Sequence, residues 1–586
     1  MTLRTRAIIF SLRAHIMNEI DQTTLTVVNN YLTGTCREMG LAMVRTAYSP
    51  MFNEALDFSC VIFNRSGRLI GQAEFCPSQI GTIKGTVECV IDVMGLEAFS
   101  EGDILLTNDP YHGVGHVPEF TVLKGIFGSD GRLLFCVANC AHMAEPGAKV
   151  PGGLAGDATE IYQEGLILPP VWLYRDGHEV EDIWSVILAN HRTPECSRGD
   201  LLAMVGSLTV AEKRLHELLD HYGEEKVEAV ADELLEVAER RMRAEITKIP
   251  DGKYYYEDVL EDDGVGTEDI VMRVNVDISG SNLTANFDGT DPQAKGPMNA
   301  NLSVTASAVY NAILHLTDPN IPRNDGCYRP ISVKAPLGTV LNCKHPAALV
   351  GGNTEISPRI TDMIFGALLT ALPETVPAGL GGTSCCFLFG GQHPKTEEPY
   401  AHFHFEGVGW GARYGQDGNN VVIVINGNCM ATPVEIFETR FPFIVENYRL
   451  LEDSGGAGEW RGGLGGERIL TVNAPEVTVS ALFNRTRLAP PGRNGGLDGA
   501  KAGIYVRRLG QREFSTFKDA FRTQSDAKFS GVTLSKGDQV RLVFPGGGGY
   551  GDPRKRNWDL VRRDIELGFV STNAARTIYG LTDINA

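Results

Sequence analysis

Several features that would place a protein in a familiar class are missing from this chain of 586 residues. No stretch reaches the roughly 18 consecutive apolar residues of a membrane helix, so we expect no membrane-spanning segment. The twelve cysteines form no pair of C-x-x-C motifs at zinc spacing, which predicts a reduced, cytoplasmic protein without a structural zinc site. The formal net charge of −20 argues against a nucleic-acid partner, because phosphate binding needs clustered lysine and arginine.

Two nucleotide or catalytic signatures are also missing. The chain has no G-x-x-x-x-G-K-[ST] phosphate loop and no G-x-S-x-G nucleophile elbow. The glycine run 546–551 does match G-x-G-x-x-G, but Asp552 and Pro553 follow at once and no βαβ pattern surrounds it. The run is typical either of dinucleotide binding or of a loop that approaches another backbone closely, and we favour the loop.

The N-terminus resembles a signal peptide only superficially. Residues 1–17 carry basic residues and a short apolar run that Arg13 and His15 interrupt, and no small-residue cleavage pattern follows. We therefore expect a poorly ordered extension here, with Met17 as an alternative start.

Hydrophobic periodicity predicts an α+β fold with two intertwined lobes. Helical spacing marks residues 18–50, 82–94 and 200–247, and two hairpins are expected at 57–74 and 121–139. We assign 18–248 to an N-terminal lobe with a strand-rich core and packed helices. After Ile249 the sequence turns to alternating strands and then to glycine-rich segments, which predicts a β-dominated lobe over 249–555. Residues 556–586 form a helical tail with one short basic helix.

A cluster of histidines and carboxylates within 107–174 indicates a divalent metal site. His116 and Glu119 share a Pro-containing loop, and the 121–139 hairpin should bring Glu119 and His142 to the same end of two paired strands. Asp57, before the first hairpin, adds a carboxylate. Imidazole with carboxylate suits Zn, Mn or Fe(II). The alternative is that both histidines are simply hydrogen-bonded loop residues.

Long blocks of the chain resemble the hydantoinase B family, the B-type subunits of ATP-dependent hydantoinases, lactamases and ketone carboxylases. The matching blocks are NDPYHGVGHVPE (108–119), NCAHMAEPG (139–147), ATEIYQEGLILPPVWLY (158–174), GDL (199–201), FDGTDPQAKGPMNAN (287–301), IPRNDGCYRPISV (321–333), GWGARYGQDGNN (409–420) and PGGGGYGDP (545–553). The resemblance implies Asp57, His116, Glu119 and His142 as metal ligands.

The chain departs from the family pattern at several of these positions. Glu119 stands where the family usually has Asp, and Glu145 also replaces an Asp. Met143 replaces a second histidine, and Gln79 or Ser78 replaces a histidine that members often carry shortly after the first hairpin. The alternatives are a metal site with shifted geometry, a site for a different metal, and a site that no longer binds one.

The resemblance also implies a division of labour between two subunits. An A-type partner binds ATP and phosphorylates the carbonyl of a small-molecule substrate, and the B-type subunit completes the reaction within a hetero-oligomer. We therefore expect a B-type subunit of a cyclic-amide (hydantoin or lactam) hydrolase, with His112 or Glu145 assisting proton transfer. The alternatives are a subunit of an ATP-dependent ketone carboxylase and a non-catalytic scaffold.

Overall fold

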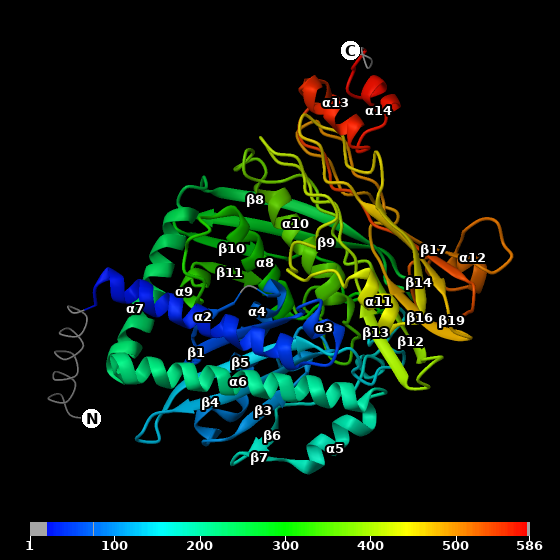
Figure 1. The fold of residues 1–586 in the computed structure, drawn as a ribbon. Coiled ribbons are helices and arrows are strands. Elements are labelled where there is room, and N and C mark those ends of the chain that lie inside the picture. The colour runs from blue at the N-terminus through cyan, green and yellow to red at the C-terminus, as the bar shows by residue number, and fades with distance from the viewer. Residues whose placement is uncertain (1–19, 74, 583–586) are drawn as a thin grey trace.

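The computed structural model describes residues 20–73 and 75–582. The predicted extension 1–17 lies outside the described residues. The α+β class is confirmed: the described residues form four sheets with helices packed between them (Figure 1). Within the described part of the chain, no helix has both the length and the apolar character needed to cross a membrane.

The N-terminal sheet has seven antiparallel strands in the order β2-β1-β5-β4-β3-β6-β7. They are β1 Phe58–Asn64, β2 Leu69–Gln72, β3 Ile104–Thr107, β4 Glu119–Phe127, β5 Leu133–His142, β6 Val171–Arg175 and β7 His178–Glu179. Both predicted hairpins are confirmed as the pairs β1-β2 and β4-β5. The three central strands β1, β5 and β4 are buried on both faces almost throughout, which explains their continuous apolar runs.

Helices of the N-terminal part pack against this sheet. They are α2 Gln22–Thr46, α3 Pro50–Asn53, α4 Pro77–Met94, α5 Glu181–Asn190, α6 Pro194–Tyr222 and α7 Glu224–Ile246, with the 3₁₀ turns η1 Leu96–Ala98, η2 Pro110–His112 and η3 Ile161–Gln163. Asp21 caps α2 by accepting a hydrogen bond from the Thr24 amide at 2.6 Å. Gly223, with φ of 78°, separates α6 from α7 and so divides the predicted helical range 200–247.

The middle of the chain builds a second sheet with the order β11-β10-β9-β8. Its strands are β8 Gly252–Asp262, β9 Glu268–Ser279, β10 Asn282–Asn286 and β11 Ile331–Lys334, and its helices are α8 Leu302–Leu316, α9 Asp325–Tyr328, the π-helix η4 Gly352–Ile356 and α10 Ser357–Leu368. One hydrophobic cluster runs from Leu25 to Leu482 and includes residues on both sides of 250. The two halves therefore share a core.

Two further sheets, β13-β12-β16-β19 and β14-β15-β20-β17-β18, lie beside this body (yellow to orange in Figure 1). Their strands are β12 Cys386–Gln392, β13 Pro399–His404, β14 Phe443–Leu450, β15 Gly466–Val472, β16 Glu476–Leu482, β17 Gly503–Arg507, β18 Ser515–Thr516, β19 Lys528–Ser535 and β20 Gln539–Val543, with α11 Val434–Arg440 and α12 Phe517–Phe521. A second hydrophobic cluster, from Cys385 to Phe544, fills the space between these sheets.

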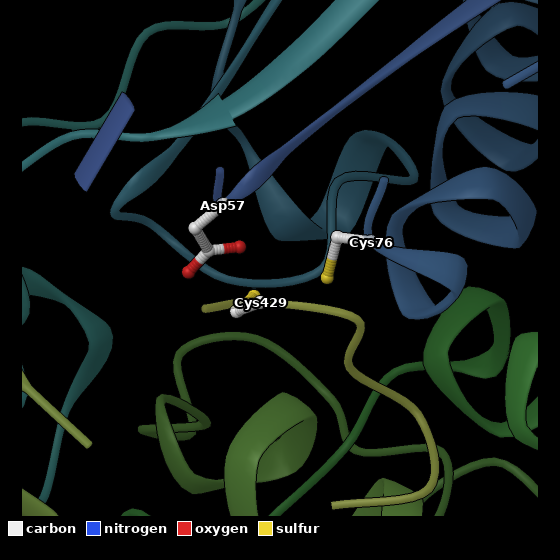
Figure 2. Close-up of side chains that lie close together, drawn as sticks. All are labelled: Asp57, Cys76 and Cys429. Atoms are coloured by element: carbon white, nitrogen blue, oxygen red, sulfur yellow. The ribbon is translucent and has the colours of Figure 1, made fainter. Parts of the chain in front are cut away.

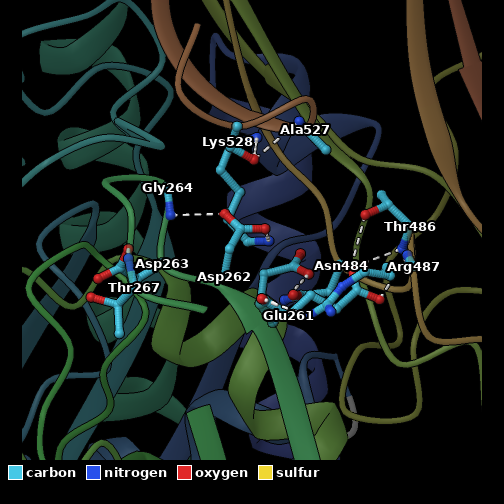
Figure 3. Close-up of polar contacts among 12 residues, drawn as sticks. Glu261, Asp262, Asp263, Gly264, Thr267, Asn484, Thr486, Arg487, Ala527 and Lys528 are labelled. Carbon is cyan, nitrogen blue, oxygen red and sulfur yellow. Dashed lines mark hydrogen bonds and ion pairs between the residues drawn. The ribbon is translucent and has the colours of Figure 1, made fainter. Parts of the chain in front are cut away.

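Buried polar contacts tie the end of β8 to the C-terminal sheets (Figure 3). Lys528 is fully buried and its Nζ donates to Asp262 Oδ2 at 3.0 Å. The neighbouring Glu261 carboxylate accepts from the Thr486 amide and hydroxyl and from the amides of Arg487 and Leu488. Each of these buried charges is paired or hydrogen-bonded, as burial in a low-dielectric interior requires.

The expectation of one helix in the tail is wrong. After η5 Pro553–Lys555 the chain forms two helices, α13 Trp558–Glu566 and α14 Thr572–Thr577. Gly568 adopts φ of 68° just beyond α13, and Ser571 then caps α14 by accepting a hydrogen bond from the Ala574 amide at 3.0 Å. This pair of stop and start signals divides the tail between two helices.

The glycine run 546–551 is a backbone-packing loop, in agreement with the reading favoured by its sequence context. The amides of residues 546–549 donate to the carbonyls of Ala500, Gly463, Gly379 and Leu497. No amide in this stretch is left to hold a pyrophosphate. A Cβ on Gly546 would lie 1.8 Å from the Ser454 carbonyl oxygen, so glycine is required for the approach.

Alanine at Gly546 tests this requirement. We expect Gly546→Ala to lower the free energy of unfolding by ~3 kcal/mol or more, because backbone atoms cannot move aside as side chains do. Gly206→Ala is the control: Gly206 lies exposed in α6, and a Cβ added there would meet no atom within 4 Å. Alanine at this control position should stabilise the helix by ~1 kcal/mol. Denaturant unfolding measures both, and equal stability of Gly546→Ala and the parent chain would contradict the packing role.

Candidate metal centre

The candidate site forms where three neighbouring strands of the N-terminal sheet end. Glu119, the first residue of β4, pairs directly with His142, the last residue of β5. The His142 amide donates to the Asp57 carbonyl at 3.0 Å, which places Asp57 on the other side of β5, just before β1. His116 joins them from the loop before β4, where its carbonyl accepts from the Glu119 amide at 3.0 Å. All four predicted ligands thus lie at one end of the sheet.

These four side chains line one small cavity of about 50 Å³. The other lining residues are Cys76, Ser78, Asn353, Thr354, Ser384, Phe403, Phe405, Ile423, Val424, Asn426, Gly427 and Cys429. The volume suffices for a cation and a water molecule, whose share of liquid volume is ~30 Å³, and is too small for a lactam ring. Residues from both halves of the chain close the site.

The two histidines present unpartnered nitrogens to this cavity. His116 Nδ1 lies 3.2 Å from the Val350 carbonyl oxygen, and His142 Nδ1 lies 3.0 Å from the Met143 carbonyl oxygen. Both carbonyls favour the tautomer with the proton on Nδ1, which leaves Nε2 as an acceptor. Both Nε2 atoms are buried, and neither has a hydrogen-bond partner. The centroids of the two imidazole rings are 5.0 Å apart. This arrangement suits metal-ligating histidines.

Amide side chains orient the two carboxylates. Asn353 Nδ2 donates to Glu119 Oε1 at 2.7 Å, while Glu119 Oε2 is buried without a partner. Gln79 Nε2 donates to Asp57 Oδ1 at 3.0 Å. Asn353 lies in the π-helix η4, a distortion that often marks functional sites. His116 Nε2 and Glu119 Oε1 are 3.7 Å apart.

Burial favours the neutral form of all four side chains, so it raises the pKa of each carboxyl group and lowers the pKa of each imidazole. It raises the pKa of Glu119 to about 8, with the Asp57 carboxylate adding to the rise, and raises the pKa of Asp57 to about 6. Burial lowers the pKa of His116 to about 4 and holds the pKa of His142 well below its ordinary value. Two carboxylates and two neutral imidazoles are donors of the types that a divalent cation binds. In the described structure their ligand atoms do not all lie within 4.8 Å of one another, so binding would need side-chain movement.

The two residues predicted to transfer protons lie outside the cavity lining. The buried Glu145 carboxylate accepts from Arg192 Nη1 at 2.9 Å and from the Gly147 amide at 2.7 Å, so it stabilises the loop after β5. His112 Nδ1 lies 2.7 Å from Asp109 Oδ2 on the partly exposed turn η2. A proton-transfer role for either residue stays a prediction.

Several lining residues have no signal in the sequence around the histidines. Asn353, Phe403 and Cys429 come from the second half of the chain, and only tertiary packing brings them to the cavity. Phe403 stacks on His142 with ring centroids 4.6 Å apart. The sequence did suggest Gln79 or Ser78 as the substitute for a family histidine: Ser78 lines the cavity, and Gln79 donates to Asp57.

Comparisons with known proteins agree on one family. Residues 21–553 match the profile described as hydantoinase B/oxoprolinase. Caprolactamase subunit beta of Pseudomonas jessenii is 34% identical over 573 residues, covering 96% of this chain and 97% of that relative. The crystal structure of ATP-dependent caprolactamase from Pseudomonas jessenii superimposes with a TM-score of 0.88 at 32% identity, over 97% of each chain. A nucleotide-free acetone carboxylase gives 0.85 at 20% identity, over 96% of this chain and 80% of that one, which shows a shared fold.

Glu119 should make the stability of the metal-free protein depend on pH. Its folded pKa of about 8 lies above the ordinary 4.5, so the folded chain holds an extra proton between these values and loses stability as pH rises through them. The two histidines, whose pKa values are lowered by folding, make stability rise with pH, but only up to their ordinary pKa of ~6.5. We expect Glu119→Gln to flatten the fall in unfolding free energy between pH ~6.5 and ~8 by up to ~1.4 kcal/mol per pH unit. Denaturant unfolding with a chelator present measures the slope.

Glu164→Gln is the matched control for this measurement. Burial also raises the pKa of Glu164 to about 8, but its Oε1 accepts from the amides of Leu349 and Val350 and the residue does not line the cavity. Glu164→Gln should therefore flatten the fall in unfolding free energy with pH by a similar amount. If Glu119→Gln kept the slope of the parent chain, the raised pKa of Glu119 would be refuted.

Proposed function

The chain belongs to the hydantoinase B/oxoprolinase family, and on that premise we propose that it is the B-type subunit of an ATP-dependent cyclic-amide hydrolase. Its substrate is a hydantoin or lactam whose carbonyl a separate A-type subunit has phosphorylated. One observation carries the metal-assisted form of this proposal: His116 Nε2, His142 Nε2 and Glu119 Oε2 are all buried and unpartnered on the wall of one cavity.

In this proposal Asp57, His116, Glu119 and His142 hold a divalent cation, with Zn, Mn and Fe(II) suited to mixed nitrogen and oxygen ligands. The cation would lower the pKa of a bound water so that hydroxide forms near neutral pH. The protein supplies the orientation: the Val350 and Met143 carbonyls fix the histidine tautomers, and Asn353 and Gln79 hold the carboxylates. Glu119 reaches one methylene further than the family's Asp.

The proposed assembly places ATP on the partner. The chain lacks a phosphate loop, and the amides of its glycine run 546–549 are already bonded to backbone carbonyls. The cavity of about 50 Å³ is smaller than the substrate ring with the side chains as they lie in this structure. Both features support a hetero-oligomer in which the partner delivers an activated substrate.

Removing one histidine tests the catalytic site. In the reconstituted complex, His116→Ala should lower ATP-dependent ring opening of hydantoins or lactams by at least ~100-fold, since even loss of an outer-shell partner costs ~10–100-fold at metal sites. The exposed His178 of β7 provides the control, and His178→Ala should stay within a few-fold of the parent complex. An unchanged rate in His116→Ala would remove the metal from the mechanism.

The same assay separates the rival functions. ATP-dependent incorporation of labelled bicarbonate, without ring opening, would assign the chain to a ketone carboxylase. Purified chain with neither activity and with far less than one Zn, Mn or Fe per molecule would indicate a scaffold subunit.

Metal binding is measurable without the partner. A ligand that binds only the folded chain stabilises it by ~2.7 kcal/mol at a concentration 100 times its dissociation constant. Excess Zn²⁺ or Mn²⁺ should therefore raise the melting temperature of the parent chain and of Glu164→Gln, and raise that of Glu119→Gln much less. Equal shifts in all three would show that the cation binds elsewhere.

A further inference from the structure

Two cysteines that line the same cavity lie close to Asp57. The ligand atoms of Asp57, Cys76 and Cys429 all lie within 4.8 Å of one another, and His116, Glu119 and His142 are not part of this group. Figure 2 shows the two sulfur atoms and the carboxylate directed toward a common space. We propose that these three side chains form a second cation site, a thiolate site for a Zn²⁺-like ion, which shares Asp57 with the histidine set.

The spacing of the three ligand atoms fits such an ion. A tetrahedral centre with metal–sulfur bonds of ~2.3 Å places two sulfur atoms ~3.8 Å apart, so a spread within 4.8 Å needs only small side-chain adjustments. Binding converts both thiols to thiolates and releases two protons to solvent. Three protein ligands leave a fourth position open, which is the pattern of catalytic and not of structural zinc sites.

The surroundings of Asp57 favour a cation. The side chain is only 8% exposed, and its carboxylate faces the Gln79 amide and the two thiols without an ion pair to a described lysine or arginine. Burial of a carboxylate is unfavourable unless a charge offsets it. A divalent ion held with the two sulfur atoms would provide that charge.

Backbone contacts hold both cysteines in place before any ion binds. Cys76 exchanges two hydrogen bonds with the Ser59 hydroxyl of β1, at 2.7 and 3.1 Å. Next to Cys429, the Met430 amide donates to the Ala55 carbonyl at 2.9 Å, two residues before Asp57. The two sulfur ligands are 353 positions apart in sequence (429 minus 76), yet both are attached to the segment that carries the carboxylate. Such fixed ligands lose little conformational entropy on binding.

The position of the site gives it a role beside the histidine set. Because Asp57 belongs to both groups, an ion on the thiolate side would adjoin the proposed hydrolytic centre. Two adjacent ions bridged by a carboxylate can stabilise the attacking and leaving oxygens of one displacement. The thiolate site does not require the hydrolase function and is tested without it.

Cobalt reports thiolate ligation directly. Metal-free full-length chain, kept reduced with a phosphine, is titrated with Co²⁺ while the near-ultraviolet thiolate-to-cobalt charge-transfer band is recorded. We expect the band in the parent chain and in His116→Ala, and its loss in Cys76→Ser and in Cys429→Ser. Cys89→Ser, at a partly exposed cysteine of α4 outside the cavity, is the matched control and should keep the band.

The contrary outcomes are equally definite. Absence of the band in the parent chain, or its persistence in both cysteine variants, would overturn the thiolate site. Loss of the band in folded His116→Ala would overturn its separation from the histidine set. Circular dichroism checks folding, and Cys429→Ser remains informative if Cys76→Ser fails to fold, because Cys429 is only partly buried. Inactivity of the parent chain toward hydantoins would leave each of these results unaffected.

Discussion

The register between three antiparallel strands is the constraint on which the candidate site depends. Glu119 on β4 opposes His142 on β5, and the His142 amide bonds to the Asp57 carbonyl ahead of β1. A slip of one residue in either pairing would turn alternate side chains to the opposite face and separate these groups. The apolar strands fix the register because both faces of the sheet are buried. The core that stabilises the fold therefore also sets the spacing of the proposed ligands.

Burial gives these polar groups their chemistry. Two carboxyl groups and two imidazoles are buried in the cavity. Burial raises the pKa of the carboxyl groups and lowers the pKa of the imidazoles, so the neutral form of each is favoured. Hydrogen bonds from Asn353 and Gln79 and to two backbone carbonyls fix the orientations but leave one acceptor on each histidine and on Glu119 unpartnered. Unsatisfied buried acceptors are unfavourable in a folded protein. A cation bound between them, as proposed above, would offset this cost.

The second half of the chain completes what the first half begins. The π-helix η4 supplies Asn353, β13 supplies Phe403, and the segment after β13 supplies Cys429. The glycine run 546–551, which resembles a nucleotide loop in sequence, packs backbone against backbone instead. This division supports the proposal that ATP binds to the partner subunit. Cys76 and Cys429 also line this cavity, and with Asp57 they form the proposed thiolate site.

Short-range features of the sequence were enough to predict the α+β class, the two hairpins, the long helices and the grouping of His116, Glu119 and His142, because period and turn residues act over short distances. Family resemblance supported Asp57 as the fourth ligand. The sequence could not show that Glu145 is bound to Arg192, that Gly568 and Ser571 divide the tail into two helices, or that Asn353 and Cys429 reach the cavity. The helix boundary depends on backbone conformation at single residues, and the other contacts join segments up to hundreds of residues apart. These features emerge from the folded chain, because contacts between distant segments leave no periodicity in the sequence.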